Sequence, residues 1–138
     1  MSVAFNNVMV IDQTELAVQL HEDGVRAYQE GRIADAESFF DGALKLFEAL
    51  DGADSPDVAA VLCDLGTVAE DRCDYKAAEQ AFHRAAAIAD QWRNADDEDL
   101  QRLCLRAWND LGRVLRMQNR CQQAQTNLST SAAICAHP

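Results

Sequence analysis

Residues 65–85 have the sequence LGTVAEDRCDYKAAEQAFHRA, and the spacing of its small and large residues occurs three times along the chain. In this copy Ala78 and Phe82 follow Gly66 at offsets of twelve and sixteen residues. The same offsets connect Gly24, Ala36 and Phe40 in one further copy, and Gly112, Ala124 and Leu128 in the other. The glycines lie 42 and 46 residues apart, a period typical of stacked helix-turn-helix units. The chain is therefore predicted to be a helical repeat protein.

The residue types at these positions have a packing reason. Glycine and alanine allow two antiparallel helices to approach closely, and a large apolar residue then fills the remaining gap. A single helical hairpin cannot bury its apolar face alone, so neighbouring copies stack and share one core. Three copies are about the minimum that folds.

Capping residues mark where the helices begin. Asp12 followed by Glu15 forms a capping box, and Ser55 precedes Pro56, which loses nothing at a first helical position. The acidic residues 96–99 favour the positive end of another helix. We therefore predict helices at about residues 13–30, 33–50, 56–72, 75–92, 97–118 and 121–136.

This pattern resembles the tetratricopeptide repeat. The matching residues are Leu65, Gly66, Tyr75, Ala78, Phe82 and Ala85 in repeat two, Gly24, Tyr28, Gly31, Ala36, Phe40 and Ala43 in repeat one, and Trp108, Leu111, Gly112 and Ala124 in repeat three. The longer period and the segment 55–59 resemble the kinesin-light-chain-type variant in particular. The resemblance implies an all-α fold of three tandem helix-turn-helix units in a short right-handed solenoid. The repeats would span about residues 13–54, 55–95 and 96–138.

The apolar residues 1–12 lie outside these repeats, and we expect Val3–Ile11 either to fray or pack over repeat one, or to dock into a groove. No stretch approaches the roughly 20 apolar residues that cross a bilayer, and the N-terminus lacks the basic start of a secretion signal. The five cysteines form no C-x-x-C pair. These features predict a cytoplasmic protein without membrane contact.

Motifs for catalysis are missing from the sequence. His21, His83 and His137 are scattered, and there is no H-E-x-x-H motif, glycine-rich phosphate loop or nucleophile elbow. We therefore predict no enzyme activity, no cofactor and no metal site.

The charges are unevenly distributed along the chain. Residues 1–58 contain three basic and twelve acidic groups, residues 59–100 contain four and ten, and residues 101–138 contain five and one. The overall net charge of −11 argues against nucleic-acid binding. An acidic body is thus predicted to end in a basic repeat.

The basic residues of repeat three are all arginines. At about 100° per residue they fall on one side of a helix, in a stripe up to about 27 Å long. They are Arg102, Arg106, Arg113, Arg116 and Arg120. The opposite side, predicted to face the core, contains Leu100, Leu103, Ala107, Leu111, Val114 and Leu115.

In the family that the chain resembles, the first helix of each hairpin lines a concave groove that binds ligands. The resemblance transfers this role to Val18, His21, Val25, Tyr28, Cys63, Thr67, Glu70, Arg106, Asn109, Arg113 and Arg116. Two alternatives stay open for the arginines in this groove. They are neutralised within the chain by Asp64, Glu70 and Asp71 or by solvent, or they bind an acidic segment of a partner protein.

Three functions follow from these features. The favoured one is a non-enzymatic adaptor whose groove holds a segment of a partner protein. The second is a self-associating scaffold, either a dimer or a head-to-tail oligomer in which the basic end of one copy meets the acidic body of another. The third is a small acidic chaperone for secretion substrates.

Overall fold

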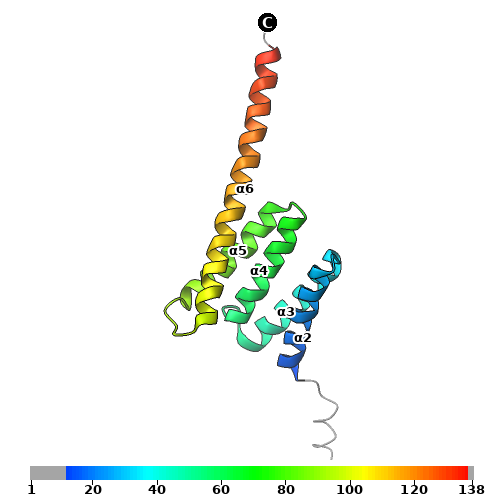
Figure 1. Cartoon of the computed structure of the whole chain (residues 1–138), viewed down its shortest axis with the longest axis vertical. Coiled ribbons are helices and arrows are strands. Elements are labelled where there is room, and N and C mark those ends of the chain that lie inside the picture. Colours follow the sequence, from blue (N-terminus) through cyan, green and yellow to red (C-terminus); the bar gives the residue numbers. More distant parts are fainter. Residues whose placement is uncertain (1–11, 137–138) are drawn as a thin grey trace, which may run out of the picture.

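The computed structural model describes residues 12–136, with side chains placed for residues 12–120 and 122. Its helices are α2 (Gln13–Gln29), α3 (Ile33–Asp51), α4 (Pro56–Asp71), α5 (Tyr75–Gln91) and α6 (Glu98–Ala136), as Figure 1 shows. The described part of the chain is thus all-helical, as predicted. The segment Val3–Ile11, for which a docking role was considered, lies outside the described residues.

The predicted helix starts at residues 13 and 56 are confirmed by their caps. The Asp12 carboxylate accepts a hydrogen bond from the Thr14 backbone N–H, at 3.0 Å. The Ser55 hydroxyl oxygen accepts one from the Val58 N–H, at 3.2 Å, and Pro56 is the first residue of α4. These contacts satisfy N–H groups that have no partner within the helix itself.

Helices α2 and α3 form one antiparallel hairpin, and α4 and α5 form a second. In each hairpin a phenylalanine ring packs directly on a glycine of the first helix. A Cβ atom added to Gly24 would lie 2.5 Å from Phe40 Cε1, and one added to Gly66 would lie 2.5 Å from Phe82 Cε1. No side chain fits in that space, so the two glycines set the distance between paired helices.

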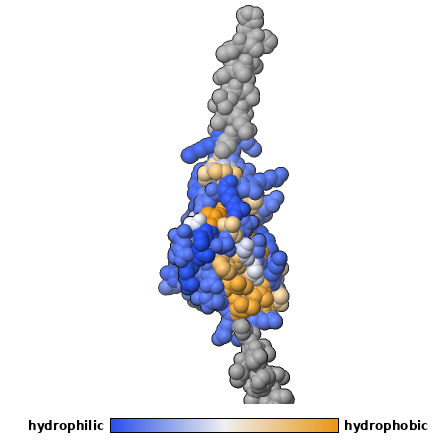
Figure 2. All heavy atoms as spheres, turned by 90° about the vertical axis from the view of Figure 1, so that its right-hand side faces the viewer, coloured by the Kyte–Doolittle hydropathy of each residue, from blue (hydrophilic) through white to orange (hydrophobic). Residues whose placement is uncertain are grey.

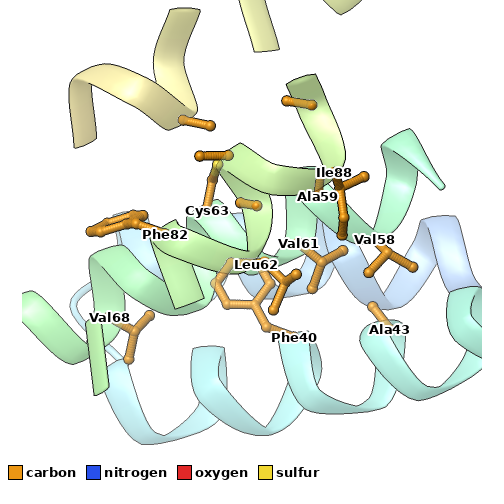
Figure 3. Close-up of a cluster of buried hydrophobic side chains, with 14 of the residues drawn as sticks. Phe40, Ala43, Val58, Ala59, Val61, Leu62, Cys63, Val68, Phe82 and Ile88 are labelled. Atoms are coloured by element: carbon orange, nitrogen blue, oxygen red, sulfur yellow. The ribbon is translucent and has the colours of Figure 1, made fainter. Parts of the chain in front are cut away.

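Helix α4 lies at the centre of the buried core. Figure 3 shows Phe40 and Ala43 of α3 on one side of it, and Phe82 and Ile88 of α5 packed with it. Helix α6 adds Ala107, Leu111 and Val114 to this core. The prediction for Leu115 is wrong, because its side chain is 45% exposed on α6.

The predicted turn between residues 118 and 121 is absent, and helices 97–118 and 121–136 are one continuous helix, α6. In repeat one the chain turns at Gly31, whose φ is +80°, and in repeat two at Cys73 before the capping residue Asp74. Between Gly112 and Pro138 the sequence has no glycine or proline to end a helix. The third unit therefore has no second helix in the described residues.

The structural period also differs from the glycine spacing. Helices α2, α4 and α6 begin 43 and 42 residues apart, whereas the glycines are 42 and 46 apart. Gly66 is the eleventh residue of α4, but the eleventh residue of α6 is Trp108, and Gly112 comes one turn later. Gly66 allows the paired helix to approach α4 closely, whereas the large side chain of Trp108 prevents such an approach at the corresponding point of α6.

The described residues therefore form two hairpins followed by one long helix, rather than the three helix-turn-helix units that were predicted. The right-handed twist of the solenoid stays a prediction. Figure 2, viewed from the side of α2 and α3, shows an apolar patch toward the end of the molecule where α2 begins. Exposed apolar side chains of these two helices include Leu16, Val18 and Leu50.

Candidate protein-binding face

The first helices of the repeats, α2, α4 and α6, are connected by polar side chains about one structural period apart. Bonded pairs between α2 and α4 are 43 residues apart, and those between α4 and α6 are 42 or 43 apart. The pairs are His21 with Asp64, Tyr28 with Asp71, Asp64 with Arg106, and Glu70 with Arg113. In a stack of repeats, corresponding positions are neighbours, so the period itself predicts which side chains meet.

Asp64 of α4 is the centre of this arrangement. One of its oxygens lies 2.5 Å from His21 Nε2, and the other accepts a hydrogen bond from Arg106 Nη2 at 2.7 Å. The Asp64 side chain is only 16% exposed, so both contacts are partly shielded from water. Arg106 also lies 3.6 Å from the buried Asp110 carboxylate of its own helix. Burial is the largest single influence on Arg106 and lowers its pKa, but the bond to Asp64 and the negative charges of Asp64 and Asp110 together outweigh burial, so the pKa is raised.

Arg113 bridges two carboxylates on different helices. Its Nε and Nη2 donate to the two oxygens of Glu70, at 3.0 and 2.9 Å, which is the paired geometry of a guanidinium with a carboxylate. Its Nη1 donates to Asp110 Oδ1 at 2.9 Å. The bond to Glu70 is the main reason that the pKa of Arg113 is raised. We call His21, Asp64, Arg106, Asp110, Arg113 and Glu70 the polar belt.

A second bridge joins α2 to α4 beyond the belt. The Tyr28 hydroxyl donates to Asp71 Oδ2, and this bond raises the pKa of Tyr28 to about 12. Between the two helices lies a hollow of about 100 Å³. Its lining consists of Val25, Tyr28, Phe40, Asp64, Thr67 and Arg106. Ligand pockets are usually about 300–1,000 Å³, so this hollow has room for about one side chain and not for a larger ligand.

The structure brings most of the predicted groove residues together. His21, Glu70, Arg106 and Arg113 belong to the polar belt, and Val25, Tyr28 and Thr67 line the hollow. Val18 is exposed near the start of α2, and Asn109 and Arg116 are exposed on α6.

Cys63 was predicted to face the groove, and this is wrong. Its side chain is fully buried in the core, and burial raises the pKa of its thiol to about 12. Helix α4 has neighbours on both sides, α2 and α3 on one and α5 and α6 on the other. Cys63 lies at the edge of the groove face of α4 and is therefore covered by these neighbouring helices. A helix at the end of the stack has neighbours on one side, so its corresponding position is more exposed to solvent.

The arginine stripe divides into two groups. Arg106 and Arg113 bond within the polar belt, mostly to the carboxylates Asp64 and Glu70 that were considered for this role. Asp71, the third candidate, bonds to Tyr28 instead. Arg102 pairs only with the neighbouring exposed Asp99, and Arg116 forms no hydrogen bond or ion pair with another residue that the structure describes.

The bonds from Arg106 to Asp64 and from Arg113 to Glu70 belong to one of the two alternatives left open by the sequence, whereas the bond between His21 and Asp64 was not predicted. The separation of 42–43 residues between the bonded side chains is the signal that finds these pairs. Among the side chains that the structure places within residues 12–136, no three histidine, cysteine or acidic residues could hold a metal ion. None of the helices in that range has the length and apolar character needed to span a membrane.

Residues 25–91 match the family model described as tetratricopeptide repeat. The match begins in the middle of α2 and ends at the last residue of α5, so it covers most of the two hairpins and stops before α6. A search of curated proteins found no match to the chain. The kinesin-light-chain-type variant stays a prediction.

Proposed function

Because the chain is a tetratricopeptide-repeat protein, we propose that it is an adaptor that binds a segment of another protein on the face formed by α2, α4 and α6. Repeats of this family generally mediate protein–protein interactions and are typically non-enzymatic. The observation that carries the proposal is the combination of the hollow with the polar belt. Together they present one recess for a side chain and a row of fixed hydrogen-bonding groups.

The chemistry of this face favours a peptide segment with at least one carboxylate. Arg106 and Arg113 are 45% and 42% exposed, although they are bonded within the chain. Part of each guanidinium therefore stays open to a ligand, while Asp64 and Glu70 hold it in place. An arginine that is already oriented loses less side-chain freedom on binding.

Site-specific photocrosslinking tests this proposal without disturbing the belt. A photoreactive amino acid replaces the exposed Asn109 of α6, and a matched variant has it at Lys45, an exposed position of α3. Each variant is irradiated in an extract of the native cell, and adducts are identified by mass spectrometry. We expect a protein adduct from position 109 and none from position 45. Equal adducts from both positions, or adducts from position 45 alone, would reject the assignment of the face.

Self-association is the second candidate, and the charge distribution favours it. Helices α2 to α5 belong to an acidic region, whereas α6 has five arginines. Three of these, Arg102, Arg116 and Arg120, are exposed and have no carboxylate partner outside their own helix among the described residues. Light scattering at rising salt concentration tests this candidate, because screening weakens contacts between opposite charges. A constant monomeric mass at low salt and high protein concentration would exclude it.

A further inference from the structure

One side of α6 has exposed apolar residues where a paired helix is missing. Leu105, Trp108 and Leu115 are 62%, 50% and 45% exposed, and at about 100° per residue they share a helix face with Gly112. We call these four residues the open face. Cys63 and Gly66, which stand 42 positions before Leu105 and Trp108, are both buried.

The open face has the local form of a docking site for a helix. Trp108 projects from it, and beside it Gly112 leaves a notch, because a Cβ at Gly112 would meet only the end of Arg116, at 3.6 Å. In the two hairpins the space beside Gly24 is filled by Phe40, and the space beside Gly66 by Phe82. Exposed tryptophan next to a notch is the kind of residue that dominates binding energies at protein interfaces.

Charge at the edge of the open face indicates what the occupant is. The Nη1 of Arg116 borders the notch, and Arg116 has no hydrogen-bond or ion-pair partner among the described residues. Among the described residues, Arg102, one turn before the open face, pairs only with Asp99, and both side chains are more than 70% exposed. An occupant with carboxylates beside its apolar residues would pair with both arginines.

The C-terminal part of this chain does not fit that description. Residues 121–136 contain no acidic residue, so they cannot neutralise Arg116. They also continue α6 in a straight line, away from its first half, as Figure 1 shows.

We propose that the open face binds an acidic amphipathic helix of a partner protein, which packs beside α6 as the missing second helix of the third repeat. A large apolar residue of that helix lies in the notch at Gly112, against Trp108 and Leu115. Its carboxylates pair with Arg116 and Arg102. The open face contains no residue of the polar belt or of the hollow, so the inference does not depend on the adaptor proposal.

The chain supplies a suitable probe in its own α3. A synthetic peptide of residues 33–51 has five carboxylates, one lysine and the apolar side chain of Phe40, which already packs on a glycine. The peptide is labelled with fluorescein, and its anisotropy is measured with the full-length chain. We expect saturable binding that weakens at least tenfold with Trp108→Asp and about threefold to tenfold with Arg116→Glu. Leu16→Asp, at an exposed apolar position of α2 outside the predicted groove, is the matched control and should bind as the parent chain does.

Further measurements distinguish an acidic partner helix from a second copy of the chain and from the chain's own residues as the occupant of the open face. A peptide in which asparagine and glutamine replace the carboxylates should bind equally to the parent chain and to Arg116→Glu. Light scattering of the chain alone should give a monomer, and in a Trp92→Phe background acrylamide should quench Trp108 freely.

The proposal fails if Trp108→Asp binds the α3 peptide as well as the parent chain does, or if the parent chain does not bind it. A dimer that Trp108→Asp dissociates would assign the open face to a second copy instead. A shielded Trp108 in a monomer would assign it to the chain's own residues. Circular dichroism checks that each variant keeps its helical content.

Discussion

The same short repeat pattern gives a closed pair of helices in the two hairpins and a single long helix in α6. In the hairpins a glycine meets a phenylalanine ring, and the chain turns back at Gly31 or Cys73. In α6 the glycine is one turn out of place, Trp108 stands at the contact point, and no turn residue follows. The comparison teaches that a repeat closes only when its contact residues and its turn residues agree in register.

The largest expected difference concerns the two aromatic residues. Phe82→Ala removes a fully buried ring from α5 and should lower the free energy of unfolding by about 3–5 kcal/mol. Trp108→Ala removes a half-exposed ring from α6 and should change it by less than about 1 kcal/mol. Urea denaturation followed by circular dichroism measures both. Equal losses would mean that α6 is packed as closely as the hairpins.

The glycines should differ in the sign of their effect. Gly66→Ala places a Cβ against the Phe82 ring and should cost about 1–3 kcal/mol, because overpacking forces the helices apart. Gly112→Ala meets only the flexible end of Arg116 and should stabilise α6 by up to about 1 kcal/mol, since alanine is the better helix former. Thermal unfolding of the two variants tests this. A loss of stability in Gly112→Ala would show that a helix does cover that position.

Two carboxylates that pair with arginines of α6, Glu70 of α4 and Asp99 of α6 itself, provide a smaller contrast. Glu70→Gln weakens the paired bond to Arg113 and should cost about 1 kcal/mol, because Glu70 is largely shielded although Arg113 is partly solvated. Asp99→Asn removes the carboxylate from a mostly solvated pair in the first turn of α6, and it should cost less, at most about 0.5 kcal/mol. Chemical denaturation at low and high salt compares them. If both variants lose the same stability, the polar belt adds nothing to the hairpins.

The smallest effect is a dependence on alkaline pH. Burial raises the pKa of the Cys63 thiol from 9.0 to about 12, so the unfolded chain ionises first. The stability that the neutral thiol gives is fully present below about pH 9 and is lost as the pH rises toward 12. Between pH 9 and 10 the parent chain should lose more stability than Cys63→Ala, by under about 1 kcal/mol. Parallel slopes for the two proteins would contradict the burial of this thiol.

The sequence predicts the two hairpins because their decisive contacts are local in pattern. Gly24 and Phe40 predict a closely packed pair of helices, and Asp12 and Ser55 predict where helices begin. For α6 the glycine pattern was misleading, since Ala124 and Leu128 keep the right offsets without a turn before them. The glycine spacing of 46 rather than 42 residues indicates that Gly112 is displaced along its helix, because four extra residues amount to about one helical turn.

The candidate face was predicted in part. The groove positions of Arg106 and Arg113 follow from helix periodicity, but their bonds to Asp64 and Glu70 depend on how far α6 slides along α4. A rotation of 100° per residue fixes the side of a helix and not its axial shift. For the same reason periodicity could not distinguish the covered Cys63 from the partly open Thr67.

The polar bridges between repeats restrict how such a chain can evolve. Each bridge joins side chains 42 or 43 positions apart, and the two members differ in chemistry: an imidazole with a carboxylate, a phenol with a carboxylate, a guanidinium with a carboxylate. A duplicated repeat would bring corresponding residues together, aspartate beside aspartate or arginine beside arginine, and these repel one another. The three units are therefore not interchangeable modules, and their order along the chain is part of what the sequence encodes.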